Sequence, residues 1–367
     1  MCKKLTVGEM FSGPGGIGLA LNLAKHPKFS FVHKWATDYD KDTSETYIHN
    51  VLKGYKNAKD LFYLGDIRGI NIDSLPEVDG FLYGFPCNDF SLVGEQKGFK
   101  GKFGALYSYG IKYINRVNPL FFFAENVSGI KSSNSGKALK KILHDLNHAG
   151  KYGYTLTVNL YKFEDYEIPQ RRHRYIIIGI RGDLGLTFQV PTPSYKIVTC
   201  KEALESIDPK AKNQEKVRQS DRVIKRLHYI GEGENAWQAE SAMPDELKLK
   251  VKGARLSQIY RRLDSHKPAY TITGSGGGGT HVYHWSEPRA LTNRERAKLQ
   301  TFPDDFEFFG STQSVRKQIG MAVPCKGAKI ILEAVLKTLA KENYPHIAPS
   351  DGIYNANSLE DVSTENS

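Results

Sequence analysis

Cys87 is the first residue whose type and position suggest chemistry. It stands in the stretch "YGFPCNDFS", directly after an apolar run and behind Pro86. A thiolate is a competent nucleophile where nearby cations or dipoles lower its pKa. The proline restricts the approach of the chain and can aim the thiol. Cys87 is therefore a candidate nucleophile, and a buried thiol at a strand end is the alternative interpretation.

Glu125 ends a run of phenylalanines in "FFFAENV". Apolar surroundings favour the protonated form of a carboxyl group, so such a residue can act as a proton donor. A strand-end carboxylate held in a salt bridge is the alternative.

Charged residues also open an apolar run in "QRRHRYIIIGI", residues 170 to 180. A buried strand does not require three arginines and a histidine at its start, whereas a phosphate or an anionic intermediate does. A solvated strand start remains the alternative.

Residues 13 to 18 read Gly-Pro-Gly-Gly-Ile-Gly and match a G-x-G-x-x-G pattern between two apolar stretches. Such a turn lets the backbone approach a ligand closely at the end of a first strand. Asp38 lies 20 residues beyond Gly18 and suits a ribose diol, and Asp66 suits an adenine amino group. These features indicate an adenosine ligand but do not separate NAD from S-adenosylmethionine. A tight turn without a ligand is the alternative.

Alternating strands and helices must position these residues. The patterns predict strands over 4–11, 29–38, 79–86, 119–127, 154–163 and 174–180. They predict helices over 16–26, 43–52 and 137–150, and residues 101–115 lead into a further helix. This order favours an α/β fold with a doubly wound, mostly parallel sheet, and a smaller second domain. Thr292 and Glu295 stand in capping-box positions of a later helix, and 317–342 is expected to form a last apolar helix.

The character of the chain changes after Gly182, where a proline-marked boundary leads into a long charged region. We expect a catalytic domain at 1–188, an inserted domain and hinge at 189–310, a helix returning to the catalytic domain at 311–343, and a disordered tail at 344–367.

The net charge of the 367-residue chain is +11, which favours a polyanionic partner such as nucleic acid. Apolar runs are too short for a membrane span, and the N-terminus is unlike a secretory signal, so we expect a cytoplasmic protein without a membrane partner. The four scattered cysteines suggest neither zinc nor disulfides, and no metal is expected.

Taken together and in order, these motifs resemble those of the cytosine-5 DNA methyltransferases of bacterial restriction-modification systems. "FSGPGG" resembles the cofactor motif of that family, "GFPC" the nucleophile motif, "ENV" the acid motif and "QRRHR" the Gln-x-Arg-x-Arg motif. "RALTNRERAKLQTFPD" and "QIGMAVP" resemble the last two motifs. The resemblance runs from about residue 5 to 340 and leaves out the insert and the tail.

The resemblance implies a Rossmann-like, S-adenosylmethionine-dependent fold and a reaction on a cytosine flipped out of DNA. Cys87 would add to carbon 6 while Glu125 donates a proton to ring nitrogen 3. Carbon 5 then becomes enamine-like and takes the methyl group. Arg174 would contact the carbonyl oxygen of the base, and Arg172 would lie near the thiol and a backbone phosphate.

The same resemblance assigns residues to the cofactor and to DNA. The implied cofactor site comprises Phe11, Ser12, Gly13, Gly15, Gly16, Asp38, Tyr39, Asp66, Ile67, Pro86, Ala322 and Val323. The implied DNA contacts are Asn88 and Ser91, in a mobile loop at 88–104, and Arg255, Arg261, Arg262, Thr271 and Thr273 in a target recognition domain. Asn126 would help to hold the loop, and Lys248, Lys250 and Lys252 are further phosphate candidates.

Two residues depart from the pattern of the family. Asn88 stands where glutamine is usual, and this change is expected to affect base flipping or the stability of the loop. Met321 stands where asparagine is usual, so a polar contact beside the cofactor is expected to be missing or replaced. Neither departure touches Cys87 or Glu125, so we expect an active enzyme.

The predicted function is site-specific methylation of double-stranded DNA by a monomer, with a restriction endonuclease as a possible companion. A transfer RNA cytosine-5 methyltransferase would use the same residues and is the first alternative. A nicotinamide dehydrogenase would explain the glycines and Asp38 but not "GFPC" with "ENV". A DNA-binding module without catalysis is disfavoured because Cys87, Glu125 and Arg174 are all present.

Overall fold

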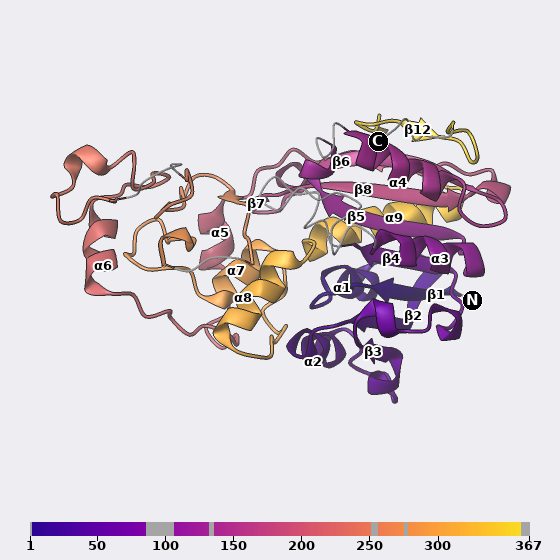
Figure 1. Ribbon diagram of the computed structural model, residues 1–367, viewed down its shortest axis with the longest axis horizontal. Coiled ribbons are helices and arrows are strands. Elements are labelled where there is room, and N and C mark those ends of the chain that lie inside the picture. Colours follow the sequence, from indigo (N-terminus) through magenta and orange to yellow (C-terminus); the bar gives the residue numbers. More distant parts are fainter. Residues whose placement is uncertain (1, 86–105, 132–135, 251–255, 275–277, 361–367) are drawn as a thin grey trace, which may run out of the picture. The chain divides into compact units, whose positions relative to one another are not determined.

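The computed structural model describes residues 2–85, 106–131, 136–250, 256–274 and 278–360. Two compact units make up the chain (Figure 1). Unit 1 contains residues 1–162, 173–193 and 327–367, and unit 2 contains 163–172 and 194–326. No helix in the described ranges is long and apolar enough to cross a membrane.

An eight-stranded sheet forms the centre of unit 1, in the order β12-β6-β8-β5-β4-β1-β2-β3. The strands β3, β2, β1, β4 and β5 run parallel, whereas β8 is antiparallel to both β5 and β6. Their bounds are β1 Lys3–Met10, β2 Phe29–Asp38, β3 Phe62–Leu64, β4 Gly80–Gly84, β5 Phe121–Val127, β6 Tyr154–Lys162, β8 His173–Arg181 and β12 Ile353–Tyr354. The predicted mostly parallel sheet is therefore confirmed, with β8 antiparallel between β5 and β6 and the short β12 antiparallel to β6 at the edge.

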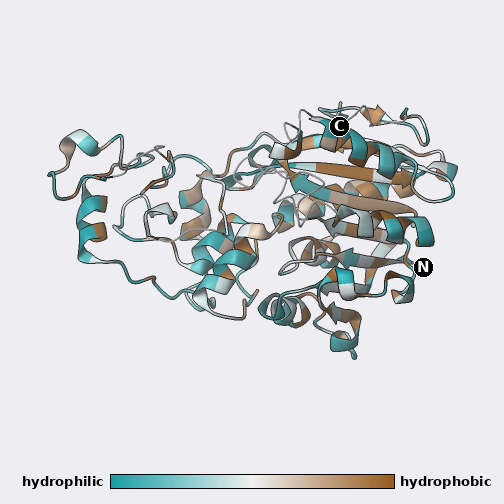
Figure 2. Ribbon diagram, in the orientation of Figure 1, coloured by the Kyte–Doolittle hydropathy of each residue, from teal (hydrophilic) through white to brown (hydrophobic). Residues whose placement is uncertain are grey.

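Helices cover both faces of this sheet. The helices α3 (Tyr107–Val117) and α4 (Lys137–Asn147) pack on one face, where their apolar side chains join those of the strands in one buried cluster. The remaining helices of the unit are α1 (Gly16–Leu23), α2 (Lys41–Asn50) and most of α9 (Cys325–Leu339). The amide of Lys25, just after α1, donates to Glu333 of α9, which joins these two helices. In Figure 2 the central strands are the most hydrophobic part of this unit.

Two glycines let the phenylalanine rings of β5 lie flat against its neighbours. Gly80 of β4 is paired with Phe121, and Gly179 of β8 is paired with Phe122. A Cβ atom on either glycine would lie 2.2 Å from the paired ring. A side chain at either glycine would clash with the paired ring and displace β5, together with Glu125 at the end of that strand.

Unit 2 contains little regular structure. Its helices are α5 (Cys200–Glu205), α6 (Asp221–His228), α7 (Asn293–Leu299) and α8 (Thr312–Met321). The short strands β7 (Gln170–Arg171) and β10 (Ala269–Tyr270) pair in parallel. Thr292 and Glu295 form the predicted capping box of α7. A small apolar cluster around Leu227, Tyr260 and Tyr283 forms its core.

Two expectations for the C-terminal part are wrong. The predicted single helix over 317–342 is two helices, α8 and α9, separated at Ala322–Pro324. Proline has no amide hydrogen to donate and keeps the residue before it extended, so the helix stops and restarts. The return to unit 1 therefore starts near residue 327 instead of 311.

The expected disordered tail is also wrong for residues 344–360. The strand β11 (His346–Ile347) pairs with β9 (Val190–Pro191), and β12 extends the main sheet beside β6. The side chain of Asn147 holds this segment by donating to the Asn355 carbonyl at 2.7 Å. Residues 361–367 lie outside the described residues.

Candidate active site

The carboxyl ends of four neighbouring parallel strands carry the candidate residues. Met10 is paired with Thr37 on one side and with Tyr83 on the other, and Gly84 is paired with Glu125. One residue further along, Asp38, Phe11, Gly84 and Glu125 thus lie in one row across the sheet. Ligands bind at this edge in open α/β sheets. The sheet brings the predicted turn, ribose acid and proton donor to one edge.

The glycine turn between β1 and α1 has the open backbone that a bound ligand requires. Phe11, Gly13 and Gly15 adopt positive φ angles of 58, 55 and 100°. A Cβ atom on Gly13 would meet nothing within 4 Å, whereas one on Gly15 would lie 2.5 Å from Val51. Gly15 therefore packs against the protein, and Gly13 faces open space.

Asp38 ties this turn to the end of β2. The Gly13 amide donates to its carboxylate at 3.0 Å, and the Asp40 amide donates to its other oxygen at 3.1 Å. Burial raises the pKa of Asp38, and these two amides oppose that shift. Each carboxylate oxygen retains a lone pair with which it can accept a hydroxyl hydrogen. Beside it Tyr39 exposes 62 % of its surface.

Asp66 and Ile67 follow β3 and differ in how far they are exposed to solvent. Ile67 is buried, whereas the Asp66 carboxylate is half exposed and forms an ion pair with Arg68. Asp66 also caps a short helical turn by accepting from the Arg68 amide at 3.0 Å. An amino group that binds Asp66 must share its carboxylate with Arg68.

A buried polar network under the glycine turn was missed by sequence reasoning. The Tyr47 hydroxyl donates to Glu9 at 2.6 Å, and it lies 3.4 Å from a ring nitrogen of His33. Burial raises the pKa of Glu9 to about 8 and lowers that of His33 to about 4. A Cβ atom on Gly18 would lie 2.7 Å from the Glu9 carboxylate, so this glycine admits the acid beneath α1. The only sequence signal is a glutamate inside an apolar strand.

Glu125 and Arg174 form an ion pair at the end of β5. The Arg174 Nε atom lies 3.0 Å from Glu125 Oε1, and both side chains are nearly buried, at 13 % and 12 % exposure. Burial lowers the pKa of Arg174, and the Glu125 charge opposes that shift. Val127 of β5 is paired with Arg174 of β8, which fixes their approach. The antiparallel β8 thus delivers a cation to the acid at the active edge.

Cys87, Pro86, Asn88 and Ser91 lie outside the described residues. The structure describes the chain up to Phe85, which is buried and follows β4. Asn126 Nδ2 donates to the Phe85 carbonyl at 3.4 Å. The chain thus leaves the sheet toward the nucleophile motif next to the strand that carries Glu125.

Comparison with known proteins places the chain in a family. Residues 5–337 match the family of C-5 cytosine-specific DNA methylases. The Type II methyltransferase M.BbvI of Brevibacillus brevis is 54 % identical over 94 % of both chains. M.NgoFVII of Neisseria gonorrhoeae is 38 % identical over 92 % of this chain and 88 % of its own length. The chain belongs to the C-5 cytosine-specific DNA methylase family.

Solved structures share the fold of this methyltransferase. A putative DNA modification methyltransferase encoded in an E. coli prophage superposes with a TM-score of 0.68 at 23 % identity, covering 92 % of this chain and 99 % of the other. The Dnmt2 methyltransferase of S. pombe gives a TM-score of 0.57 at 19 % identity, with the same coverage. The predicted S-adenosylmethionine-dependent methyltransferase fold is confirmed, and the chain is a DNA (cytosine-5-)-methyltransferase.

Arg172 of the methyltransferase is held by main-chain carbonyls. It lies in unit 2 and is 1 % exposed, and its two terminal nitrogens donate to the carbonyls of Ile272 and Gly320 at 3.1 and 3.0 Å. Through these two contacts the side chain connects the 272 segment to α8. The phosphate contact of Arg172 stays a prediction.

The basic residues of unit 2 are of two kinds. Some are buried and donate to main-chain carbonyls, and others keep guanidinium donors that are not used by carbonyls. Arg262 is 7 % exposed and donates to the carbonyls of His284, Leu227 and Ile230 at 2.9 to 3.1 Å. These contacts give Arg262 a structural role inside the loop, and its DNA contact stays a prediction. Arg261 instead lies over the Tyr270 ring, 5.0 Å from its centre.

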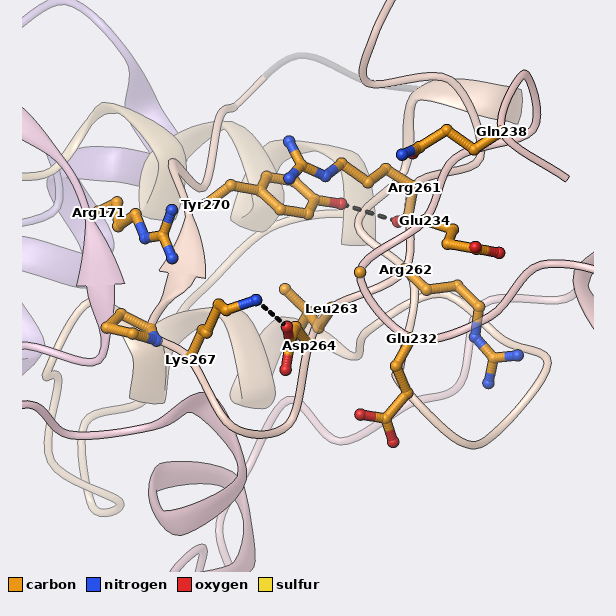
Figure 3. A pocket seen from close by; sticks show the side chains of 12 residues that line it. Arg171, Glu232, Glu234, Gln238, Arg261, Arg262, Leu263, Asp264, Lys267 and Tyr270 are labelled. Carbon is orange, nitrogen blue, oxygen red and sulfur yellow. Dashed lines mark hydrogen bonds and ion pairs between the residues drawn. The ribbon is translucent and has the colours of Figure 1, made fainter.

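A pocket of about 390 Å³ lies beside Arg261 in unit 2 (Figure 3). Arg171 and Lys267 line it with Arg261, and Glu232, Glu234 and Asp264 are also among its lining residues. Lys267 is paired with Asp264 at 2.6 Å. The open guanidinium groups of the pocket are therefore Arg171 and Arg261, which lie on either side of Tyr270 in Figure 3.

Several further predicted residues belong to unit 2. Ala322 and Val323 are buried in the link between α8 and α9, and Met321 is 45 % exposed. Thr271 donates its hydroxyl hydrogen to the Arg171 carbonyl at 2.7 Å, and Thr273 is exposed. Lys248 is paired with Asp245 at 2.7 Å. Arg255 and Lys252 lie outside the described residues.

Proposed function

We propose that this methyltransferase moves the methyl group of S-adenosylmethionine to carbon 5 of a cytosine flipped out of double-stranded DNA, through a covalent adduct with Cys87. The observation that carries the proposal is the Glu125–Arg174 pair at the end of β5. It lies in the same row of the sheet as the glycine turn and next to the strand that leads to Cys87.

The residues at the turn fit S-adenosylmethionine. The open face at Gly13 admits a ligand, and the N-cap of α1 is Gly15, which offers no side chain in its place. The buried Asp38 can accept from ribose hydroxyls, and exposed Tyr39 can lie against adenine. When bound, this cofactor supplies an electrophilic methyl group. The residues proposed to hold it are Phe11, Ser12, Gly13, Gly15, Gly16, Asp38, Tyr39, Asp66 and Ile67, with Pro86, Ala322 and Val323 retained from the family pattern.

The protein residues carry the rest of the reaction. The Cys87 thiolate forms a bond to carbon 6 while the Glu125 carboxyl gives its proton to ring nitrogen 3. Carbon 5 gains electron density and would bond the methyl carbon, whose bond to the sulfonium sulfur breaks as the electron pair goes to sulfur. A base then removes the hydrogen of carbon 5, the bond between sulfur and carbon 6 breaks, and nitrogen 3 returns its proton. Cys87 and Glu125 leave the cycle in the forms in which they entered it.

Arg174 has two tasks in this scheme. Its charge, 3.0 Å from Glu125, stabilises the carboxylate that remains after the proton has moved to the base. Its NH1 atom donates to the His173 carbonyl at 2.7 Å. The donors that remain are suited to the carbonyl oxygen of cytosine, because a guanidinium can serve several acceptors at once. The same pair can thus orient the base and activate it.

Unit 2 is proposed as the target recognition domain. The net charge of +11 suits a polyanion, and Arg171 and Arg261 present open guanidinium groups at one pocket. Relatives named Type II methyltransferases support a role in a restriction-modification system beside a cognate endonuclease. We further propose a cytoplasmic, monomeric enzyme that joins the nucleoid when bound to DNA, since its substrate lies there.

Methyl-transfer assays test the proposal. Labelled S-adenosylmethionine is offered with duplex DNA or with transfer RNA, and 5-methylcytosine is then mapped in the DNA. We expect label in duplex DNA at one sequence motif and none with Cys87→Ser. Label in transfer RNA but not in duplex DNA would overturn the substrate, and full activity of Cys87→Ser would overturn the covalent step.

A further inference from the structure

Arg261 is held in one orientation at the pocket of unit 2. It is half-buried, and it lines the cavity of about 390 Å³. The guanidinium group of Arg261 lies over the ring of Tyr270, with its central carbon 5.0 Å from the ring centre. The Tyr270 hydroxyl donates to the main-chain carbonyl of Arg261 at 2.9 Å (Figure 3). One tyrosine thus contacts both ends of this arginine.

The backbone around Arg261 is fixed as well. The amide of Arg262 donates to the Glu234 carbonyl at 2.9 Å, and the amide of Gly233 donates to the Leu263 carbonyl at 3.0 Å. These two bonds tie the residues that follow Arg261 to a neighbouring segment of unit 2. The guanidinium donors nevertheless remain available, because no carbonyl or carboxylate of the described residues accepts from them.

Arg171, the other open guanidinium group of the pocket, has no such support. It is exposed, and its backbone is paired with that of Tyr270 through β7 and β10. The guanidinium group of Arg171 makes no hydrogen bond, ion pair or ring contact with the residues that the structure describes. The pocket thus contains one restrained and one unrestrained guanidinium group.

Positive and negative side chains at this pocket nearly balance. Three carboxylates and three cations line it, namely Glu232, Glu234, Asp264, Arg171, Arg261 and Lys267. A fourth cation, Arg262, gives its donors to main-chain carbonyls. A DNA phosphate binds most strongly where positive charge is in excess, and nearby carboxylates repel it. The edge of a base is uncharged, so this balance favours a base as the group that the restrained arginine contacts.

Guanine is the base that matches a restrained guanidinium group. Its major-groove edge presents two acceptors, O6 and N7, and an arginine donates to both at once. This contact needs two donors at fixed places, so a side chain that is already held makes it best. A phosphate carries no base identity and serves mainly to position the protein, a task for which an unrestrained arginine is sufficient.

We propose that Arg261 determines sequence specificity by donating to O6 and N7 of one guanine in the recognition sequence, with Tyr270 holding its guanidinium group in place. The proposal rests on the proposed function, in which unit 2 recognises the DNA. Every such sequence contains guanine, because the target cytosine is paired with one. Arg171 has the different task of contacting a phosphate, which strengthens binding to every sequence equally.

Arg261→Met tests the assignment, and Arg171→Met is the matched control from the same pocket. Both changes remove one charge, so only the loss of a base contact separates them. Affinity is measured for a duplex with the mapped recognition sequence and for duplexes in which one of its base pairs is changed. For Arg261→Met we expect the ratio of these affinities to fall about 10- to 100-fold at one guanine position. For Arg171→Met the ratio should stay constant, while the steepness of log K against log salt decreases by about 0.9.

A second measurement leaves the protein unchanged. In the analogue 7-deazaguanine a C–H group replaces N7, and the analogue is placed at each guanine of the recognition sequence in turn. At one guanine it should weaken binding by wild type about tenfold, and binding by Arg261→Met less than about twofold. Equal weakening of all duplexes by Arg261→Met overturns the proposal, as does an analogue that affects wild type and this variant alike at every guanine.

The outcomes separate this proposal from the proposed function. If wild type methylates one DNA sequence and Arg261→Met keeps its full specificity, the guanine contact alone is overturned. If wild type labels transfer RNA but no duplex DNA, the proposed function is overturned, and the guanine contact with it.

Discussion

The two units of this methyltransferase use buried charge in different ways. In unit 1 buried ionisable side chains meet other side chains near strand ends, as Arg174 meets Glu125 and Tyr47 meets Glu9. In unit 2 most buried guanidinium groups donate to main-chain carbonyls, as those of Arg172 and Arg262 do. The strands of a sheet satisfy the hydrogen bonds of one another's backbone groups. Charged side chains at the strand ends are therefore not needed for that purpose and remain available for chemistry. Loops leave carbonyls unsatisfied, and arginines supply the missing donors.

Glu125→Gln gives the largest expected effect and tests the catalytic side of this comparison. The amide keeps the shape of the carboxyl group but has no acidic proton to donate, so kcat should fall about 10²- to 10⁴-fold. Single-turnover methyl transfer at saturating cofactor measures it. A loss below tenfold would reduce the pair to a structural salt bridge.

Arg262→Met tests the structural side and should destabilise unit 2 by about 3 kcal/mol, since several buried carbonyls lose a charged donor. Arg261→Met is the matched control, because Arg261 stacks on Tyr270 and should cost less than about 1 kcal/mol. Urea unfolding compares the two. Equal losses would remove the distinction between structural and open arginines.

Glu9→Gln tests how the buried carboxyl group of unit 1 makes the free energy of unfolding depend on pH. The folded-state pKa of Glu9 is raised from 4.5 to about 8, so the folded protein binds more protons than the unfolded chain in that window, and stability falls as pH rises through it. The lowered pKa of His33 acts in the opposite direction, but only below 6.5.

Between pH 6.5 and 8 the free energy of unfolding of wild type should therefore fall by about 2 kcal/mol relative to Glu9→Gln, at about 1.4 kcal/mol per pH unit. Urea unfolding of both proteins at a series of pH values measures this difference. Parallel pH dependences would show that Glu9 does not titrate in this range.

Thr292→Ala gives the smallest expected effect. It breaks the capping box of α7, and it should cost about 1 kcal/mol, because a short helix in a loop-rich unit has few other ways to satisfy its first amides. Thr292→Ser keeps the hydroxyl and should restore most of the loss in a thermal melt. A cost near zero would mean that tertiary contacts alone fix α7.

Sequence patterns predicted six of the eight strands of the sheet, because these six are apolar and five to ten residues long, but they missed the three-residue β3. Residues 29–38 form β2 as expected, and Asp38 and Glu125 lie at the predicted edge. The two-residue strands β11 and β12 could not be predicted, since they form only by pairing with strands far away in the chain. The pairing of Arg174 with Glu125 likewise depends on the antiparallel register of β8.

The roles of the arginines were the hardest to predict from sequence. Arg261 and Arg262 are adjacent and identical in type, yet one is open and the other is enclosed by carbonyls. Net charge counts both equally. Only the path of the loop backbone, set by tertiary contacts, decides which guanidinium groups remain available for a phosphate.

A duplex that carries 5-fluorocytosine at the target tests the central claim most directly. Fluorine at carbon 5 cannot leave as a proton does, so the bond between Cys87 and carbon 6 cannot break after methyl transfer. We expect a protein–DNA complex that survives denaturation, forms only with S-adenosylmethionine, and maps by mass spectrometry to the peptide containing Cys87. An enzyme that methylates ordinary DNA but forms no such complex, or forms it through another residue, would contradict the account.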